Sequence, residues 1–309
     1  MEELRRAKLE AEGDASLAAW DVPHYLGRVK ADRCDLDGRV LAAYFPLEAC
    51  LDGLALVCRS LFGIRLRQVP MMASEGWTPG DPAAVRKLLL EHPTEGGGPD
   101  GLVGTVYLDL HPRPGKYTHA AHFTLRCGCT THNDVVALVC NFSPPTASPS
   151  TVSGVGGISD GTSGGGGGTF DGGETSGSGG VCLLSHSELE TLFHEFGHAL
   201  HSLLSRTEFQ HLSGTRAEAD FVETPSHLME YFAWDYRVVK QFARHYRTRE
   251  LIPEEMMRNL NRSKALFAGI DAQIQILYAA LDQELFGPQP EGGGTLSSTE
   301  VLARLQEEV

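Results

Sequence analysis

The sequence has no apolar run long enough to cross a membrane, and it has few positive charges for its length. No stretch of its 309 residues approaches the roughly 20 apolar residues that span a bilayer, so we expect no membrane span. The chain holds 26 Lys and Arg against 40 Asp and Glu, a net charge of −14, which argues against nucleic-acid binding. Cationic peptides would suit such a charge, but acidic proteins are too common for the charge to select a partner.

Paired cysteine motifs are also missing. The seven cysteines are scattered, and none forms C-x-x-C, which excludes a zinc ribbon and a thioredoxin-type motif. We therefore expect a reducing compartment. The first residues, Met1-Glu2-Glu3, resemble neither a signal peptide nor a transit peptide, and taken literally they indicate the cytosol.

The sequence does contain His-Glu-Phe-Gly-His at residues 194–198. Histidines four residues apart lie on one face of a helix, because a turn takes about 3.6 residues. Two imidazoles so placed can reach one metal ion, with Glu195 beside it as a general base. His194 and His198 are therefore predicted metal ligands, with zinc as the expected ion. Gly197 weakens a helix relative to Ala, so its presence predicts the close approach of another backbone.

A helix around this motif is supported by its start and by its apolar face. Ser187 and Glu190 have the S-x-x-E form of a capping box, which predicts a helix start just upstream. Leucines and phenylalanines recur at helical spacing from residue 189 to residue 204. On a helical wheel His194, His198 and His201 project together from the other side, which favours a metal site over a buried helix.

A third ligand is needed, because a catalytic zinc usually has three protein ligands and one open position. The form H-E-x-x-H-x-x-G-x-x-H is excluded, since residue 204 is Leu. The candidates are Glu218, Glu223 and Glu230 on the following helix. An antiparallel return places Glu223 near the two histidines, so it is the preferred ligand.

Supporting roles follow for other side chains near the motif. Glu230 or Asp220 could accept an imidazole N–H and fix the orientation of a histidine. His201 could substitute as a ligand, although a place lining the pocket fits better. Glu195 takes a proton from the attacking water and delivers it to the leaving amine.

The expected fold is mainly α-helical, of the α+β kind, with a small sheet beside the substrate cleft. We expect helices followed by the small sheet in residues 1–142. Residues 143–180, rich in Gly, Ser and Thr, are expected to form a disordered insertion, since they have too few apolar side chains to bury a core. A phosphate-binding loop is disfavoured there, because the Gly-Lys-Ser/Thr ending is absent. A helical metal-binding region occupies residues 181–309.

Within these regions, β-branched and aromatic residues predict strands, and apolar spacing predicts helices. Strands are expected at residues 102–110, 119–126 and 135–142, and a helix at residues 83–90. After the metal helix, further helices are expected at about 220–239, 254–286 and 297–309.

Several segments resemble the thimet oligopeptidase family, the M3 metallopeptidases. They are residues 192–201 (LFHEFGHALH), 213–216 (SGTR) and 220–226 (DFVETPS), and upstream 20–23 (WDVP), 44–48 (YFPLE), 107–110 (YLDL) and 115–121 (GKYTHAA). Residues 229–239, 241–246 and 278–283 are similar to the branch of the family that processes precursors imported into mitochondria. The similarity covers nearly the whole chain except the Gly/Ser tract.

The resemblance implies a zinc-dependent endopeptidase with one Zn²⁺ per chain and Glu223 as the third ligand. It implies peptide or precursor-protein substrates, a monomer and the mitochondrial matrix. The sheet edge after Gly115, including His119, lies beside the bound peptide in this family. A general oligopeptidase of the same family, or a catalytically incomplete zinc- or peptide-binding protein, is the alternative.

Family members are about twice as long as this chain. On this resemblance we expect an N-terminal helical region to be missing. Family members also carry a glycine loop rich in His and Tyr, which contacts substrate, C-terminal to the segment that matches residues 281–283, and we expect this chain to end before that loop. The metal site is therefore expected to be complete and the active site incomplete.

Overall fold

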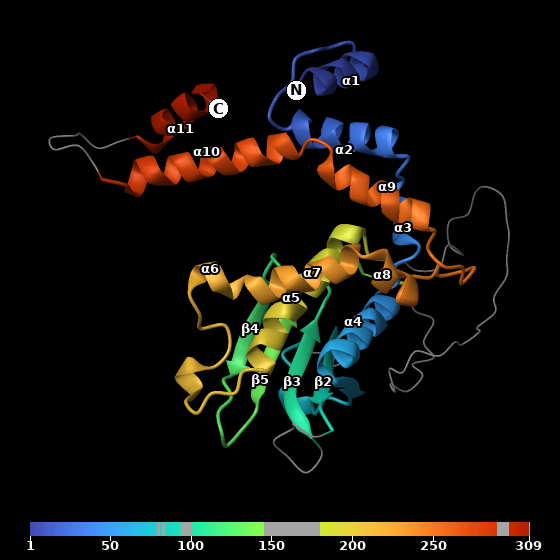
Figure 1. Ribbon diagram of the computed structural model, residues 1–309, viewed down its shortest axis with the longest axis vertical. Coiled ribbons are helices and arrows are strands. Elements are labelled where there is room, and N and C mark those ends of the chain that lie inside the picture. Colours follow the sequence, from blue (N-terminus) through green and yellow to red (C-terminus); the bar gives the residue numbers. More distant parts are fainter. Residues whose placement is uncertain (79–80, 82–83, 94–100, 145–179, 289–296, 309) are drawn as a thin grey trace. The chain divides into compact units, whose positions relative to one another are not determined.

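The computed structural model describes the whole chain except residues 79–80, 82–83, 94–100, 145–179, 289–296 and 309 (Figure 1). The described residues form two compact units, one of Asp37–Met257 and one of Met1–Leu36 with Arg258–Val309. The expected insertion at residues 143–180 lies almost wholly outside the described residues. The predicted division of the chain at that tract stays a prediction.

A mixed five-stranded sheet forms one layer of the larger unit. Its strands are β1 (Arg65–Val69), β2 (Val85–Glu91), β3 (Leu102–Asp109), β4 (Ala121–Arg126) and β5 (Asp134–Val139). They lie in the order β1-β2-β3-β5-β4. The pair of β3 and β5 is parallel and the other three pairs are antiparallel. The three predicted strands are confirmed, and β4, which follows Gly115, is an edge strand.

The helix expected at residues 83–90 is wrong, because most of this segment is β2. The strand pairs with β1 on one side and β3 on the other. Val85, Leu88 and Leu90 are at most 3% exposed. Val85 points to one face of the sheet and Leu88 and Leu90 point to the other, and all three are buried, so the simple period-two alternation is lost. The remaining apolar spacing resembles that of a helix.

Helices pack on this sheet and on one another. They are α3 (Gly38–Ala42), α4 (Leu47–Phe62), α5 (His186–Leu203), α6 (Ala219–Val222), α7 (Thr224–Trp234) and α8 (Tyr236–Phe242). Helix α5 lies on β3, β4 and β5, and α7 crosses it (Figure 1). Leu189, Leu192, Phe193 and Phe196 of α5 are completely buried, which confirms the predicted apolar face.

The helix expected at residues 220–239 is three short helices. Glu223 separates α6 from α7, and Pro225 occupies the first turn of α7, where its missing N–H costs nothing. Asp235 has an extended backbone, and its side chain accepts a hydrogen bond from the N–H of Arg237 to cap α8. These local signals outweigh the continuous apolar spacing.

The smaller unit is helical. It contains α1 (Glu2–Glu12), α2 (Asp21–Cys34), α10 (Ala268–Phe286), α11 (Ser298–Glu308) and most of α9 (Glu254–Ala265). Leu4, Tyr25 and Val29 form its core. The long helix expected at residues 254–286 is interrupted at Phe267, whose φ of 65° is left-handed.

The predicted fold class, mainly α-helical with a small sheet, is confirmed. Among the described residues, no helix combines the length and the apolar character that crossing a membrane requires.

Candidate metal centre

Helix α5 begins two residues earlier than the S-x-x-E pattern at Ser187 predicted. Ser185 is the N-cap, and its Oγ accepts a hydrogen bond from the N–H of Glu188 at 3.2 Å. In return the Glu188 carboxylate accepts from the N–H of Ser185 at 2.8 Å. Ser185 and Glu188 also have the S-x-x-E spacing, so two boxes overlapped in the sequence. The buried His186, whose Nε2 lies 3.0 Å from the Ala233 carbonyl, holds the first turn in place.

Helix α7 approaches α5 at Gly197, as its glycine predicted. A Cβ at Gly197 would lie 2.6 Å from Ser226 Cα and 2.8 Å from the Pro225 carbonyl oxygen. Real Cβ atoms are not found so close to a backbone, so only glycine fits. The two backbones are in contact one residue before His198 and three residues after Glu223. This crossing brings the carboxylate to the histidines.

Three side-chain atoms converge at the crossing of α5 and α7. Glu223 Oε2 lies 3.4 Å from His194 Nε2 and 3.1 Å from His198 Nε2. Ligands about 2.0–2.2 Å from a tetrahedral zinc lie about 3.3–3.5 Å from one another. Two imidazoles and one carboxylate are a donor set of catalytic zinc sites. Among the described residues, His194, His198 and Glu223 therefore form a group that fits a metal ion.

The carboxylate of Glu223 is also held by a hydrogen bond from Ser226. Ser226 Oγ donates to Glu223 Oε2 at 2.7 Å. Partial burial raises the pKa of Glu223, but the Ser226 hydrogen bond and the two imidazoles outweigh it, so the pKa lies below its ordinary value. Burial lowers the pKa of His198. Both shifts favour the forms that can donate electron pairs, a carboxylate and a neutral imidazole.

Glu195 is buried beside this cluster and is not part of it. Its residue is 8% exposed. Burial raises its pKa, the His194 ring opposes the shift, and the Glu223 charge adds to it. A hydrogen bond from the backbone N–H of His122 also stabilises its charged form. A carboxyl with a raised pKa next to a metal position is chemically suited to accept and return a proton.

Glu230 contacts the far nitrogen of one candidate ligand. Its Oε1 lies 2.6 Å from His194 Nδ1 and 3.0 Å from His227 Nδ1. The sequence predicts Glu230 for this role but not His227. Glu223, His227 and Glu230 are spaced i, i+4, i+7, which places them on one helical face, and that spacing is the signal that could have found it.

The other predicted residues are not part of this group. Glu218 is the N-cap of α6, and Asp220 is exposed at its start. The structure records no contact between Asp220 and either histidine among its described residues. The His201 ring packs edge-to-face on Phe221 with centroids 6.1 Å apart. Its Nδ1, like that of His198, is buried without a hydrogen-bond partner among the described residues.

The two residues predicted at the substrate edge lie on the connection between β3 and β4. Gly115 has a φ of 77°, which favours glycine, and His119 is exposed with its ring against Tyr117. Lys116 anchors this connection, because its Nζ donates to the carbonyl oxygens of Asp109 and His111 at 2.8 and 2.7 Å. The connection is therefore held at the end of β3 and leads into the edge strand.

His122 joins the edge strand β4 to the metal helix. Its Nε2 lies 3.1 Å from Ser202 Oγ, and its ring lies 6.3 Å from that of His198. Burial, with the neighbouring His198 and His201, lowers its pKa to about 4. It is therefore a neutral ring at physiological pH.

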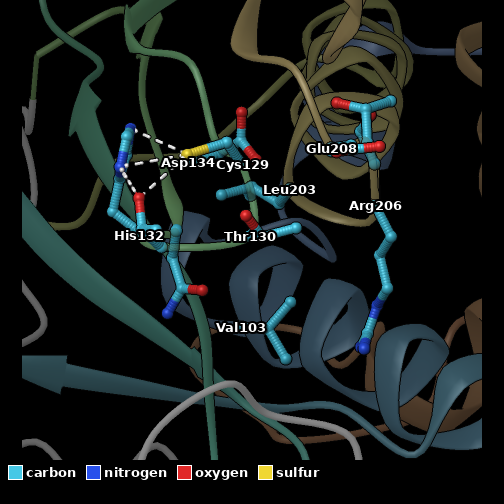
Figure 2. Close-up of a pocket in the computed structure, with 12 residues that line it drawn as sticks. Val103, Cys129, Thr130, His132, Asp134, Leu203, Arg206 and Glu208 are labelled. Atoms are coloured by element: carbon cyan, nitrogen blue, oxygen red, sulfur yellow. Dashed lines mark hydrogen bonds between the residues drawn. The ribbon is translucent and has the colours of Figure 1, made fainter.

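A separate cleft of about 680 Å³ lies elsewhere in the larger unit, where α5 ends and β3 and β5 begin. Figure 2 shows Cys129 and His132 on one side and Arg206 and Glu208 on the other. Cys129 Sγ lies 3.3 Å from His132 Nδ1. None of the candidate metal ligands lines this cleft, so it is not the metal centre.

Comparison with known proteins identifies the family of this chain. The chain matches the family described as Peptidase family M3 over residues 1–153 and 172–309. It is 43% identical over 295 residues to a mitochondrial intermediate peptidase of Arabidopsis thaliana, with 93% of this chain covered. It is 36% identical over 299 residues to the human mitochondrial intermediate peptidase, with 95% of this chain covered.

A protein with the same name from Neurospora crassa is 36% identical over 318 residues. The alignments with the plant and human proteins span 36% of each relative's own length. The family match extends over most of the chain, on both sides of the Gly/Ser tract. The chain therefore belongs to peptidase family M3, as its sequence motifs predicted.

Proposed function

We propose that this chain carries the zinc centre of a metalloendopeptidase that hydrolyses peptide bonds in oligopeptides or in the N-termini of imported precursor proteins. The observation that supports it best is the convergence of His194 Nε2 and His198 Nε2 on Glu223 Oε2, at 3.4 and 3.1 Å. His194, His198 and Glu223 hold one Zn²⁺, and Glu230 accepts the Nδ1–H of His194. When bound, the zinc polarises the scissile carbonyl and acidifies the attacking water.

Glu195 is the general base and acid of the proposed reaction. Its carboxylate takes a proton from the attacking water and gives it to the leaving amine. Its burial and raised pKa suit both halves of this role, because a pKa nearer neutrality eases the return of the proton. Its place on α5, between the two histidines, keeps the carboxyl beside the metal position.

The peptide substrate lies along the edge strand β4. An edge strand has unpaired N–H and C=O groups that can pair with an extended peptide. Gly115 and His119 lie at the entrance to this edge, and the neutral His122 ring borders it. The net charge of −14 suits a basic peptide. We propose that the protein acts as a monomer, without nucleic acid.

The mitochondrial matrix is the proposed compartment. It rests on relatives whose names are those of mitochondrial intermediate peptidases. The cytosol is the alternative, and the location of a fluorescently tagged full-length product distinguishes them. Import into the matrix supports the proposal, and a diffuse cytosolic signal contradicts it.

The chemistry is tested by metal analysis and by cleavage of a quenched fluorescent peptide. One zinc per chain, with cleavage that stops on adding a chelator and returns with zinc, supports the proposal. A chain that binds no zinc refutes the metal centre. Zinc binding without cleavage contradicts the proposed activity for this chain and favours an incomplete peptide-binding protein, since the chain spans 36% of the length of its plant and human relatives.

A further inference from the structure

We propose that His227 is a positioning residue that orients His194 for metal binding by acting through Glu230. This inference rests on the zinc centre proposed above. Glu223 is the N-cap of α7, and His227 lies one turn further along this helix. The proposed ligand Glu223, the carboxylate of Glu230 and the imidazole of His227 therefore all come from α7.

The hydrogen bonds require one particular tautomer of each ring. A carboxylate only accepts hydrogen bonds, so both nitrogens that face Glu230 Oε1 must carry protons. They are His194 Nδ1 at 2.6 Å and His227 Nδ1 at 3.0 Å. With its proton on Nδ1, His194 presents the lone pair of Nε2 toward Glu223, the form that binds a metal ion.

Solvent exposure explains why one hydrogen bond would hold Glu230 poorly. The side chains of His194 and Glu230 are 23% and 21% exposed, and that of His227 is 60% exposed. A carboxylate at such a boundary can rotate toward water. A second donor on the same oxygen restricts that rotation. The His227 ring also packs edge-to-face on the His194 ring, with centroids 5.3 Å apart.

The two candidate histidine ligands differ in this respect. His198 Nδ1 is buried and has no hydrogen-bond partner among the described residues. His194 is therefore the imidazole whose direction is fixed by a defined hydrogen bond. A change in the support of Glu230 should act on the metal site through His194.

A second metal position is the competing explanation, since His194, His227 and Glu230 also offer three ligand atoms within 4.8 Å of one another. Occupation of that position would require His194 to lose its Nδ1 proton while its Nε2 serves the first site. Both Nδ1 atoms lie at hydrogen-bond distance from Glu230 Oε1, so the contacts favour positioning. The number of zinc ions per chain distinguishes the two.

The test measures zinc affinity by competition with a chromogenic chelator, which does not depend on turnover. His227→Ala should weaken zinc binding about tenfold, at the lower end of the roughly 10- to 100-fold cost of losing an outer-shell partner. His227→Gln, which keeps a neutral donor, should recover most of the affinity. Glu230→Gln should cost more than His227→Ala. His211→Ala, an exposed histidine in the same unit, is the matched control and should bind zinc like wild type.

Three further measurements separate positioning from a loss of structure. Adding His227→Ala to Glu230→Gln should cost little more than Glu230→Gln alone, because His227 acts through that carboxylate. Nitrogen-15 spectra of the zinc-loaded chain should show the Nδ1–H signal of His194 shifted in His227→Ala. The circular dichroism spectrum should be unchanged.

Wild-type affinity in His227→Ala, additive losses in the double variant or two zinc ions per wild-type chain would each overturn the inference. A wild-type chain that binds no zinc refutes the proposed zinc centre itself. That outcome differs from one in which the wild-type chain binds zinc and His227→Ala has no effect on the affinity.

Discussion

The backbone of Ser226 fills the space where a side chain at Gly197 would be. A Cβ on Gly197 would lie 2.6 Å from Ser226 Cα and 3.0 Å from Ser226 N. The helix that carries both histidines and the helix that carries Glu223 are thus in direct backbone contact. The convergence of three ligand atoms depends on that contact.

Gly197→Ala is expected to destabilise the chain and to weaken zinc binding together. Alanine favours a helix by about 1 kcal/mol over glycine, but overpacking against a backbone that cannot move costs about 1–3 kcal/mol. It also pushes Glu223 away from the histidines. Urea unfolding and zinc competition measure the two effects.

Gly27→Ala is the matched control for this prediction. Gly27 lies inside α2, and a Cβ there would meet no atom within 4 Å. It should stabilise the protein by up to about 1 kcal/mol, the propensity term alone. If Gly197→Ala also stabilised it, the close contact with α7 would be wrong.

Glu223→Gln is expected to reduce zinc affinity by more than the roughly 10- to 100-fold that the loss of an outer partner costs, because a neutral amide is a poor zinc ligand. Glu218→Gln, five residues earlier and at the exposed N-cap of α6, should leave the affinity unchanged. Chelator competition on the two variants decides between the two glutamates. A larger effect of Glu218→Gln would contradict the assignment.

Some of this site could be predicted from the sequence because its determinants are local. The spacing of His194 and His198 within one helix requires no knowledge of the rest of the fold. Gly197 also indicated a backbone contact through its cost to a helix. Glu223 required only that the next helix return antiparallel.

What the sequence could not supply depends on contacts between distant segments. The segment of β2 looked helical because apolar residues on both of its faces, Val85 on one and Leu88 and Leu90 on the other, are buried. The sequence contains two overlapping S-x-x-E boxes, and the one that starts α5 at Ser185 is next to His186, which contacts the Ala233 carbonyl 47 residues away. Helical spacing could have predicted the contact of His227 with Glu230. Its relation to the metal site could not be predicted, because it depends on how α7 crosses α5.

Glu195→Gln is expected to keep one zinc per chain and to slow cleavage about 10²- to 10⁴-fold, the usual contribution of a general base. The amide has nearly the same shape but cannot accept a proton. Metal analysis and peptide cleavage are measured on the same preparation. Loss of zinc from this variant would contradict its exclusion from the ligand set, and near-normal cleavage would contradict its role as the base.

Thiol reagents are expected to modify Cys129 first and Cys127 next. All seven cysteines are free, and these two are the ones that are not buried. Hydrogen bonds from Thr131 lower the pKa of Cys129, whereas burial raises the pKa of Cys182 to about 11 and that of Cys58 to about 12. The thiolate is the reactive form. Brief iodoacetamide treatment followed by peptide mass spectrometry gives the order, and early labelling of Cys58 would contradict the packing around α4.

His122 is expected to make the fold less stable as the pH falls from about 6.5 to about 4. Its pKa is lowered from 6.5 to about 4 in the folded chain, chiefly by burial and further by His198 and His201. Between these two pH values the His122 ring is protonated in the unfolded chain but neutral in the folded chain, so lowering the pH favours unfolding. At about 1.4 kcal/mol per pKa unit, the full effect is on the order of 3 kcal/mol.

His122→Gln should flatten this dependence, because glutamine does not titrate and can still donate a hydrogen bond to Ser202 Oγ. Urea midpoints at pH 7, 6 and 5, measured with chelator present, should fall less steeply in this variant than in wild type. His24→Gln, which replaces an exposed histidine of the smaller unit, is the matched control. If the urea midpoint fell equally steeply with pH in wild type and His122→Gln, the ring would be able to take up a proton in the folded chain. That result would contradict a neutral His122 between β4 and α5.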